Sequence, residues 1–214
     1  MSDTAIEEAC GSDAVIRFDG HRCIHARNCV LAQPGVFRAN VAGPWINPDA
    51  ASVEALMTVA LNCPSGAITV ERLDGRPGEA PPLVNTLHLR ENGPLALHAA
   101  ISINGAAGGT RATLCRCGAS ANKPYCDGSH LGAGFQASGE PATRPSEALT
   151  VRDGTLAVAP QADGPLHLAG PLEIVSGTGR TLDRTTDAWL CRCGGSANKP
   201  YCDGTHRKIG FHAP

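Results

Sequence analysis

The chain has 214 residues, of which 18 are Lys or Arg and 20 are Asp or Glu, so its formal net charge is −2. This balance gives no indication of binding to nucleic acid or to an anionic membrane. Only 4% of the residues are aromatic, whereas 25 are Gly and 16 are Pro, a composition that favours small, turn-rich domains over one thick core. Small cores usually need disulfides or metal sites for stability, and the ten cysteines can supply either.

The amino-terminal stretch MSDTAIEEACGSDA has neither the basic nor the apolar segment of a signal peptide. No apolar run approaches the roughly 20 residues that span a bilayer. We therefore expect a cytoplasmic protein that does not associate with membranes. In a reducing compartment, paired cysteines are more often metal ligands than disulfides. Cys10 has no partner at a ligand spacing, and we expect it to be a bystander thiol in a mobile terminus.

Residues 13–75 predict a first small domain built from a strand, a loop, a helix and a strand. Residues 14–20 and 67–75 alternate between polar and apolar side chains, as half-buried strands do. Between them, residues 47–62 place apolar side chains at helical spacing, with Asn47 as the N-cap and Pro48 as the first helical residue. Residues 76–82 then form a Pro/Gly linker.

Two copies of a second unit follow this linker. The segments GPLALHAAISI (93–103) and GPLHLAGPLEI (164–174) align at an offset of 71, whereas CRCGASANKPYCDGSH (115–130) and CRCGGSANKPYCDGTH (191–206) align at an offset of 76. The difference predicts about five additional residues in the loop before the second motif. Because two copies are too few for a solenoid, we expect domains at 83–137 and 147–214 that pack as a pseudo-twofold pair.

Each motif presents three cysteines and one histidine in a pattern typical of a metal site. The candidate ligands are Cys115, Cys117, Cys126 and His130 in the first copy, and Cys191, Cys193, Cys202 and His206 in the second. We expect a helix to begin at the CDGSH or CDGTH segment, so that Cys and His at positions i and i+4 share one face. Three thiolates and one imidazole suit either a tetrahedral Zn²⁺ or a [2Fe-2S] cluster, and the spacing alone does not choose between them.

Polar side chains at three further shared positions are also candidates for a role at the site. Arg116 and Arg192, like Lys123 and Lys199, either lie on a solvated surface, or offset the negative charge of a cluster or bind an acidic redox partner. Ser120 and Ser196 either donate hydrogen bonds to cluster sulfur or cap the loop.

The pattern C-x-C-x2-S-x3-P-x-C-D-G-S/T-H resembles the signature of the CDGSH iron–sulfur domain family in both copies. The resemblance implies one [2Fe-2S] cluster per motif, with one iron held by Cys115 and Cys117 and the other by Cys126 and His130. In the second copy the pairs are Cys191 with Cys193 and Cys202 with His206. Members of this family typically set two modules side by side with intertwined strands, and this chain resembles such a dimer fused into one polypeptide. The alternative is a pair of structural zinc sites, which the tight C-x-C pair disfavours.

Residues 19–70, with the segments CIHARNC, PWINPD and NCPSGAI, resemble the divergent single-cluster 4Fe-4S ferredoxin-like domain. The candidate ligands are Cys23, Cys29 and Cys63, and Ala26 occupies the position of the middle cysteine in a bacterial ferredoxin loop. Three thiolates favour a [3Fe-4S] cluster, whereas a [4Fe-4S] cluster needs a fourth ligand from His25, water or a partner. The alternative is a metal-free fold with structural cysteines.

We therefore expect an α+β chain in which a small ferredoxin-like α/β domain precedes two strand-rich CDGSH modules packed as a pseudo-twofold pair. It would be a monomeric iron–sulfur protein that exchanges single electrons with an unidentified redox partner. The alternatives are a carrier that delivers clusters to apo-proteins and a redox- or iron-sensing interaction module. The sequence contains no phosphate loop, catalytic triad or acid–base pair that we recognise, so we do not expect an enzyme.

Overall fold

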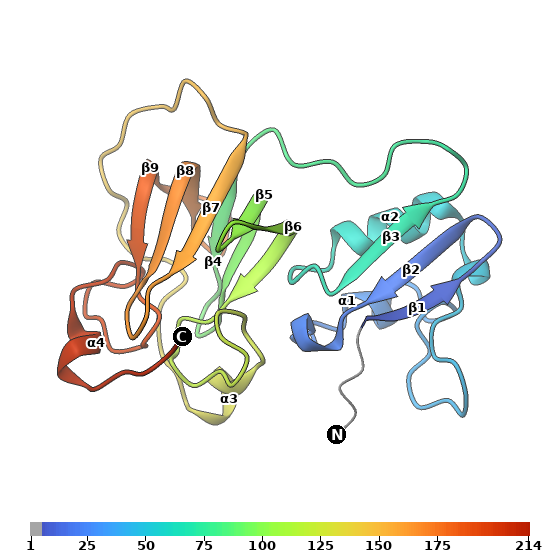
Figure 1. The fold of residues 1–214 in the computed structure, drawn as a ribbon, viewed down its shortest axis with the longest axis horizontal. Helices are drawn as coiled ribbons and strands as arrows, with labels where there is room; N and C mark the ends of the chain where they lie inside the picture. The colour runs from blue at the N-terminus through green and yellow to red at the C-terminus, as the bar shows by residue number, and fades with distance from the viewer. Residues whose placement is uncertain (1–5) are drawn as a thin grey trace. The chain divides into compact units, whose positions relative to one another are not determined.

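The computed structural model describes residues 6–214. Residues 1–5, which belong to the stretch for which we predicted no signal peptide, lie outside the described residues. The described chain is mostly strands with few helices, and it divides into two compact units, residues 1–80 and 81–214 (Figure 1). The domain boundaries at 13–75, 83–137 and 147–214 stay predictions. Among the described helices, none has the length and apolar character needed to cross a membrane.

The first unit is a three-stranded antiparallel sheet with helices packed on it. The strands are β1 (Glu7–Cys10), β2 (Ala14–Phe18) and β3 (Ile68–Arg72), in the order β1-β2-β3. The helices are α1 (Asn28–Ala32) and α2 (Val53–Leu61), and short 3₁₀ turns lie at Gly20–Arg22 and Pro48–Ala50. Ile16 of β2, Leu56 of α2 and Ile68 of β3 are buried in one core, which closes the sheet against the helix.

Two features of this unit differ from the sequence prediction. The segment from Pro48 forms only a 3₁₀ turn, because Ala51 is extended and interrupts the helical backbone. The α-helix begins at Val53, where the Ser52 hydroxyl accepts a hydrogen bond from the Ala55 amide at 3.3 Å and caps the first turn. The prediction of one helix from Asn47 was therefore wrong at its start. Strand β1, which places the exposed Cys10 opposite Val15, was not predicted.

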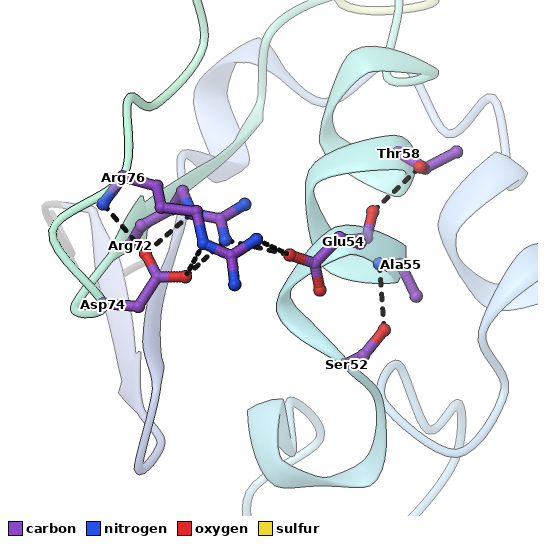
Figure 2. A network of polar contacts seen from close by, with 7 residues as sticks. All are labelled: Ser52, Glu54, Ala55, Thr58, Arg72, Asp74 and Arg76. Atoms are coloured by element: carbon purple, nitrogen blue, oxygen red, sulfur yellow. Dashed lines mark hydrogen bonds and ion pairs between the residues drawn. The ribbon is translucent and has the colours of Figure 1, made fainter.

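A charged network connects the first turn of α2 to the chain that leaves β3 (Figure 2). Arg72 donates to Glu54 at 2.9 Å and to both carboxylate oxygens of Asp74. Arg76 donates to the same Glu54 oxygen at 3.0 Å. The network thus joins a helix and a strand that pack against each other in the core.

The second unit contains both repeats in one six-stranded sheet. The first repeat supplies β4 (Thr86–Leu89), β5 (Leu95–Ile103) and β6 (Ala106–Leu114), followed by the short helix α3 (Ser129–Gly132). The second repeat supplies β7 (Thr155–Pro160), β8 (Leu166–Val175) and β9 (Thr181–Leu190), followed by α4 (Thr205–Lys208). The β5–β6 connection consists of residues 104 and 105, whereas residues 176–180 connect the longer strands β8 and β9. The longer loop predicted before the second motif is thus confirmed.

The first strand of each repeat pairs with strands of both repeats. One edge of β5 pairs with β6, and the other edge is shared between β4, which is antiparallel, and β7 of the second repeat, which is parallel. Likewise, one edge of β8 pairs with β9, and its other edge is shared between β7, which is antiparallel, and β4 of the first repeat, which is parallel. The side-chain amide of the buried Asn85 also donates to the carbonyls of Gly154 and Pro171 in the second repeat, at 2.9 and 3.0 Å. The buried core therefore draws on both repeats at once.

Candidate metal centres

Each cysteine motif is a loop fastened to the end of a long strand. In the first repeat, the Cys115 amide donates to the Pro124 carbonyl and the Cys126 amide donates to the Thr113 carbonyl, both at 2.9 Å. The second repeat has the same two bonds, from Cys191 to Pro200 and from Cys202 to Trp189, both at 2.8 Å. These bonds return the loop to the end of β6 or β9, so that the third cysteine of each motif lies beside the strand that leads into the first.

The candidate ligands of each motif lie together as two pairs. The Sγ atoms of Cys115 and Cys117 are 3.6 Å apart, and Cys126 Sγ lies 3.5 Å from His130 Nδ1. In the second motif, the Cys191–Cys193 distance is 3.8 Å and the Cys202–His206 distance is 3.4 Å. Among residues 6–214, no three His, Cys, Asp or Glu side chains are arranged to hold one metal ion.

These distances fit metal coordination by each pair. Two sulfurs that each lie about 2.3 Å from one tetrahedral metal are about 3.8 Å apart, and a sulfur and an imidazole nitrogen on one metal are about 3.5 Å apart. All four observed distances lie close to these values. Each motif therefore offers two two-ligand sites, one with two thiols and one with a thiol and an imidazole.

His130 lies close to Cys126 although helix α3 begins later in the chain than predicted. Gly128 has a left-handed backbone, with φ of 87°, and α3 begins only at Ser129, so Cys126 precedes the helix. Asp127 holds this turn by accepting from the Ser129 amide at 3.0 Å and from the Ala121 amide at 2.8 Å. Partial burial of the Asp127 carboxylate raises its pKa, but these hydrogen bonds outweigh burial and lower the pKa to about 2. Asp203 makes the equivalent bonds to Thr205 and Ala197.

The environment of the sulfur atoms combines burial with amide donors. Cys115, Cys126 and Cys191 are buried, and burial raises the pKa of Cys126 to about 11 and that of Cys191 as well. Backbone amides two residues further along donate to sulfur at 3.4 Å, at Cys117, Cys126, Cys193 and Cys202. Since a metal ligand must be a thiolate, metal binding has to release protons here, and the amide donors then stabilise the negative sulfur.

The two arginines of the motifs are buried, so the first of the two alternatives, a solvated surface, is wrong for them. Arg116 is 2% exposed and Arg192 is 1% exposed. Arg116 donates to the backbone carbonyls of Gly93 at 2.7 Å and of Arg90, Ala137 and Ser138. Arg192 donates to the carbonyls of Gln161, Gly164 and Pro214. Each arginine therefore ties the segments around its motif together and places a positive charge beside the ligand loop.

The serines cap the loops, which was one of the two predicted roles. The Ser120 hydroxyl donates to the Tyr125 carbonyl at 2.7 Å and accepts from the Asn122 amide at 3.0 Å. Ser196 makes the same bonds to Tyr201 and Asn198. Lys123 and Lys199 donate to the carbonyls of Ser120 and Ser196. These contacts fix the middle of each loop between its two ligand pairs.

The cysteines of the first unit line a separate cavity. Cys23, Cys29 and Cys63 border a space of about 300 Å³, together with His25 and apolar side chains that include Phe18, Trp45 and Ile68. Burial raises the pKa of Cys23 and of Cys29. His25 and Arg27 have left-handed backbones, with φ of 54° and 63°, and His25 Nδ1 lies 3.9 Å from Cys23 Sγ. The structure thus brings the three predicted cysteines to one cavity and adds the imidazole of His25 to its lining.

Comparison with known protein families matches both kinds of site. The family described as iron-binding zinc finger CDGSH type matches residues 92–131 and 163–207, which include both cysteine motifs. The family described as divergent 4Fe-4S mono-cluster matches residues 10–73, which include Cys23, Cys29 and Cys63. No curated protein matches the chain. The chain is therefore an iron–sulfur binding protein, with one divergent 4Fe-4S mono-cluster region followed by two tandem CDGSH-type regions.

Proposed function

We propose that the chain binds two [2Fe-2S] clusters and one cubane-type cluster and transfers single electrons to a redox partner. The observation that carries this proposal is the arrangement of each motif as two ligand pairs. A [2Fe-2S] cluster takes four protein ligands, two on each iron. When bound, such a cluster supplies reversible one-electron chemistry.

In the first motif, Cys115 and Cys117 would hold one iron, and Cys126 and His130 would hold the other. Nδ1 of His130 is the nitrogen that faces the cysteine, so we assign the ligand role to that atom. The Cys191–Cys193 and Cys202–His206 pairs would act in the same way. Neutral imidazole in place of a thiolate raises the reduction potential of a cluster, because it brings less negative charge to the iron.

In the first unit, Cys23, Cys29 and Cys63 would hold the third cluster. Three thiolates account for a [3Fe-4S] cluster, and His25 is the residue of the cavity lining that could complete a [4Fe-4S] cluster. The apolar walls of the cavity would limit access of water to the cluster. We also propose that this unit is a ferredoxin-like α/β domain.

We further propose that the two CDGSH regions form a pseudo-twofold pair within a cytoplasmic, monomeric chain. The reciprocal pairing of β4 with β8 and of β7 with β5 supports this arrangement. The proposed partner is a redox protein, and we propose no nucleic-acid or membrane partner and no enzymatic turnover.

The test is the iron and sulfide content, with visible and EPR spectra, of the anaerobically purified protein. Two [2Fe-2S] clusters and a [3Fe-4S] cluster predict about seven irons per chain, whereas a [4Fe-4S] cluster in the first unit predicts about eight. Reversible reduction without loss of iron would support electron transfer. A colourless preparation that contains zinc would overturn the proposal.

A cluster carrier is the second candidate function, because the histidine of each motif is partly exposed. His130 and His206 are partly exposed, as are Cys117 and Cys193, whereas Cys115, Cys126 and Cys191 are buried. Release of a cluster would then start at the histidine side. Incubation of the holo-protein with an apo-ferredoxin separates the two functions, since only a carrier transfers intact clusters at a useful rate.

A further inference from the structure

The two iron-binding loops of the second unit lie backbone against backbone. A Cβ atom at Gly118 would lie 2.5 Å from the carbonyl oxygen of Cys193, and a Cβ at Gly194 would lie 2.5 Å from that of Cys117. Both glycines also have left-handed backbones, with φ of 84° and 82°. Each of these two positions therefore requires glycine for two reasons: the left-handed backbone conformation and the close approach of the other loop. The contact joins the C-x-C segment of each motif directly to that of the other.

A lysine of each motif also lies over a phenylalanine ring of the other repeat. Lys199 of the second motif lies over the ring of Phe135 in the first repeat, with Nζ 6.0 Å from the ring centre. The guanidinium of Arg116 lies 5.6 Å from that same ring centre. In the mirror arrangement, Phe211 has Lys123 of the first motif at 5.8 Å and Arg192 at 5.5 Å. The positive charges of one repeat therefore lie close to those of the other.

The buried arginines extend this shared electrostatic environment. A charge removed from water acts on other charges over a longer distance, because the surrounding dielectric constant is lower. Arg116 is 2% exposed and Arg192 is 1% exposed, and each follows the first cysteine of its motif. The two loops that contain these arginines contact each other at Gly118 and Gly194.

We infer that the two clusters of the CDGSH-type regions form one electrostatically coupled pair, in which an electron on one cluster lowers the reduction potential of the other. This inference rests on the proposed function, because it requires a [2Fe-2S] cluster in each motif. An added electron increases the negative charge of its cluster, and the potential of an iron–sulfur centre falls with the negative charge around it. Since coupling is reciprocal, each cluster must affect the other equally.

The test is to change the charge of one cluster and to measure the potential of the other. His206→Cys adds a thiolate to the second cluster and gives it a spectrum distinct from that of the first. Spectroelectrochemical titration of the holo-protein should then show a lower midpoint potential for the first cluster than in the wild type. The reciprocal variant, His130→Cys, should lower the potential of the second cluster by a similar shift, because the two motifs are nearly identical in sequence.

Arg180→Gln is the matched control, because it makes the second repeat more negative by one charge without touching a motif. Arg180 precedes the ten residues of β9 and Cys191 follows them, so the two lie at opposite ends of this strand. We expect this variant to leave both potentials unchanged. A shift as large as that of His206→Cys would contradict a coupling that acts through the contact between the loops.

Lys199→Gln provides a second test that leaves every proposed ligand in place. The Lys199 side chain lies over Phe135 of the first repeat, so removing its positive charge should lower the reduction potential of the first cluster. If the first cluster keeps its wild-type potential in both His206→Cys and Lys199→Gln, the coupling is absent. If instead the wild-type protein shows no [2Fe-2S] spectrum at all, the proposed function itself fails.

Discussion

Arg116 and Arg192 are held by backbone carbonyls that lie more than twenty residues away in the chain. Gly93 and Ala137 supply two of the acceptors for Arg116, and Gly164 and Pro214 supply two for Arg192. A local pattern of Cys-Arg-Cys gives no information about such distant acceptors. The burial of these arginines therefore could not be predicted, whereas the pairing of cysteine with histidine four residues later could.

Replacing His130 or His206 by cysteine should make the affected cluster more resistant to acid. Protons compete with iron for the imidazole, whose pKa is about 6.5 when free and whose value in His130 is lowered by burial. Loss of the cluster should thus accelerate as the pH falls below about 6 and be slow above about 7. Absorbance decay at about pH 5.5 should be several-fold slower for the cluster in each variant.

The double variant adds a further measurement to this experiment. Because the two loops are in contact, the effects of the two substitutions should deviate from simple additivity. Identical decay for the wild type, both single variants and the double variant would show that neither histidine is a ligand.

At the cavity of the first unit, Ala26→Cys and His25→Ala distinguish the two forms of the third cluster. Ala26→Cys restores a fourth thiolate and should convert a [3Fe-4S] cluster into a stable [4Fe-4S] cluster, with loss of the three-iron EPR signal near g of about 2. His25→Ala should leave the wild-type signal unchanged if three thiolates suffice. A gain of the three-iron signal in His25→Ala would instead show that His25 ligates a fourth iron.

At the scale of elements, local side-chain alternation predicted individual strands, whereas the pairing of strands between the repeats was implied only by the family resemblance. The alternation of residues 14–20 and 67–75 placed β2 and β3 correctly, because each strand has one buried face. Strand β1 has the sequence EEAC, whose mostly exposed residues give no such signal. The pairing of β4 with β8 depends on contacts between residues almost ninety positions apart, such as Leu87 with Ile174, and no local pattern encodes them.

Asp74→Asn should destabilise the first unit at neutral pH and have less effect in acid. The hydrogen bond from Arg72 holds the pKa of Asp74 well below its usual range, despite the opposing effect of burial. The charged carboxylate therefore stabilises the fold above its unfolded pKa of about 3.9, and this contribution is lost as the pH falls further. Thermal unfolding followed by circular dichroism should show a midpoint lower by a few degrees at about pH 7 and a smaller difference at about pH 3.

Asp13→Asn is the control for this prediction, since it removes an exposed carboxylate from the same unit. It should change the midpoint less than Asp74→Asn at neutral pH. A difference between wild type and Asp74→Asn that stays constant from pH 7 to pH 3 would contradict a role for the charge of Asp74 in linking β3 to α2.

At the scale of the whole molecule, the pairing of β4 and of β7 with both repeats predicts that one repeat alone is incomplete. Without the second repeat, half of one edge of β5 loses its partner β7, and β4 loses β8. We expect residues 81–145, produced alone, to dimerise so that each copy supplies the missing strand to the other. Sedimentation should give a dimer with one [2Fe-2S] cluster per chain, whereas a folded monomer would contradict this view of the sheet.

Joining both halves of the shared sheet in one chain also changes how the protein can evolve. In a homodimer every substitution appears on both halves, but here each half varies independently. In the second repeat, His167 stacks on Trp189 at 4.1 Å between ring centres and contacts Asp187 at 2.7 Å. The corresponding residues of the first repeat are Ala96, Thr113 and Arg111. Selection can therefore reshape the surface beside one cluster while the other keeps its original form.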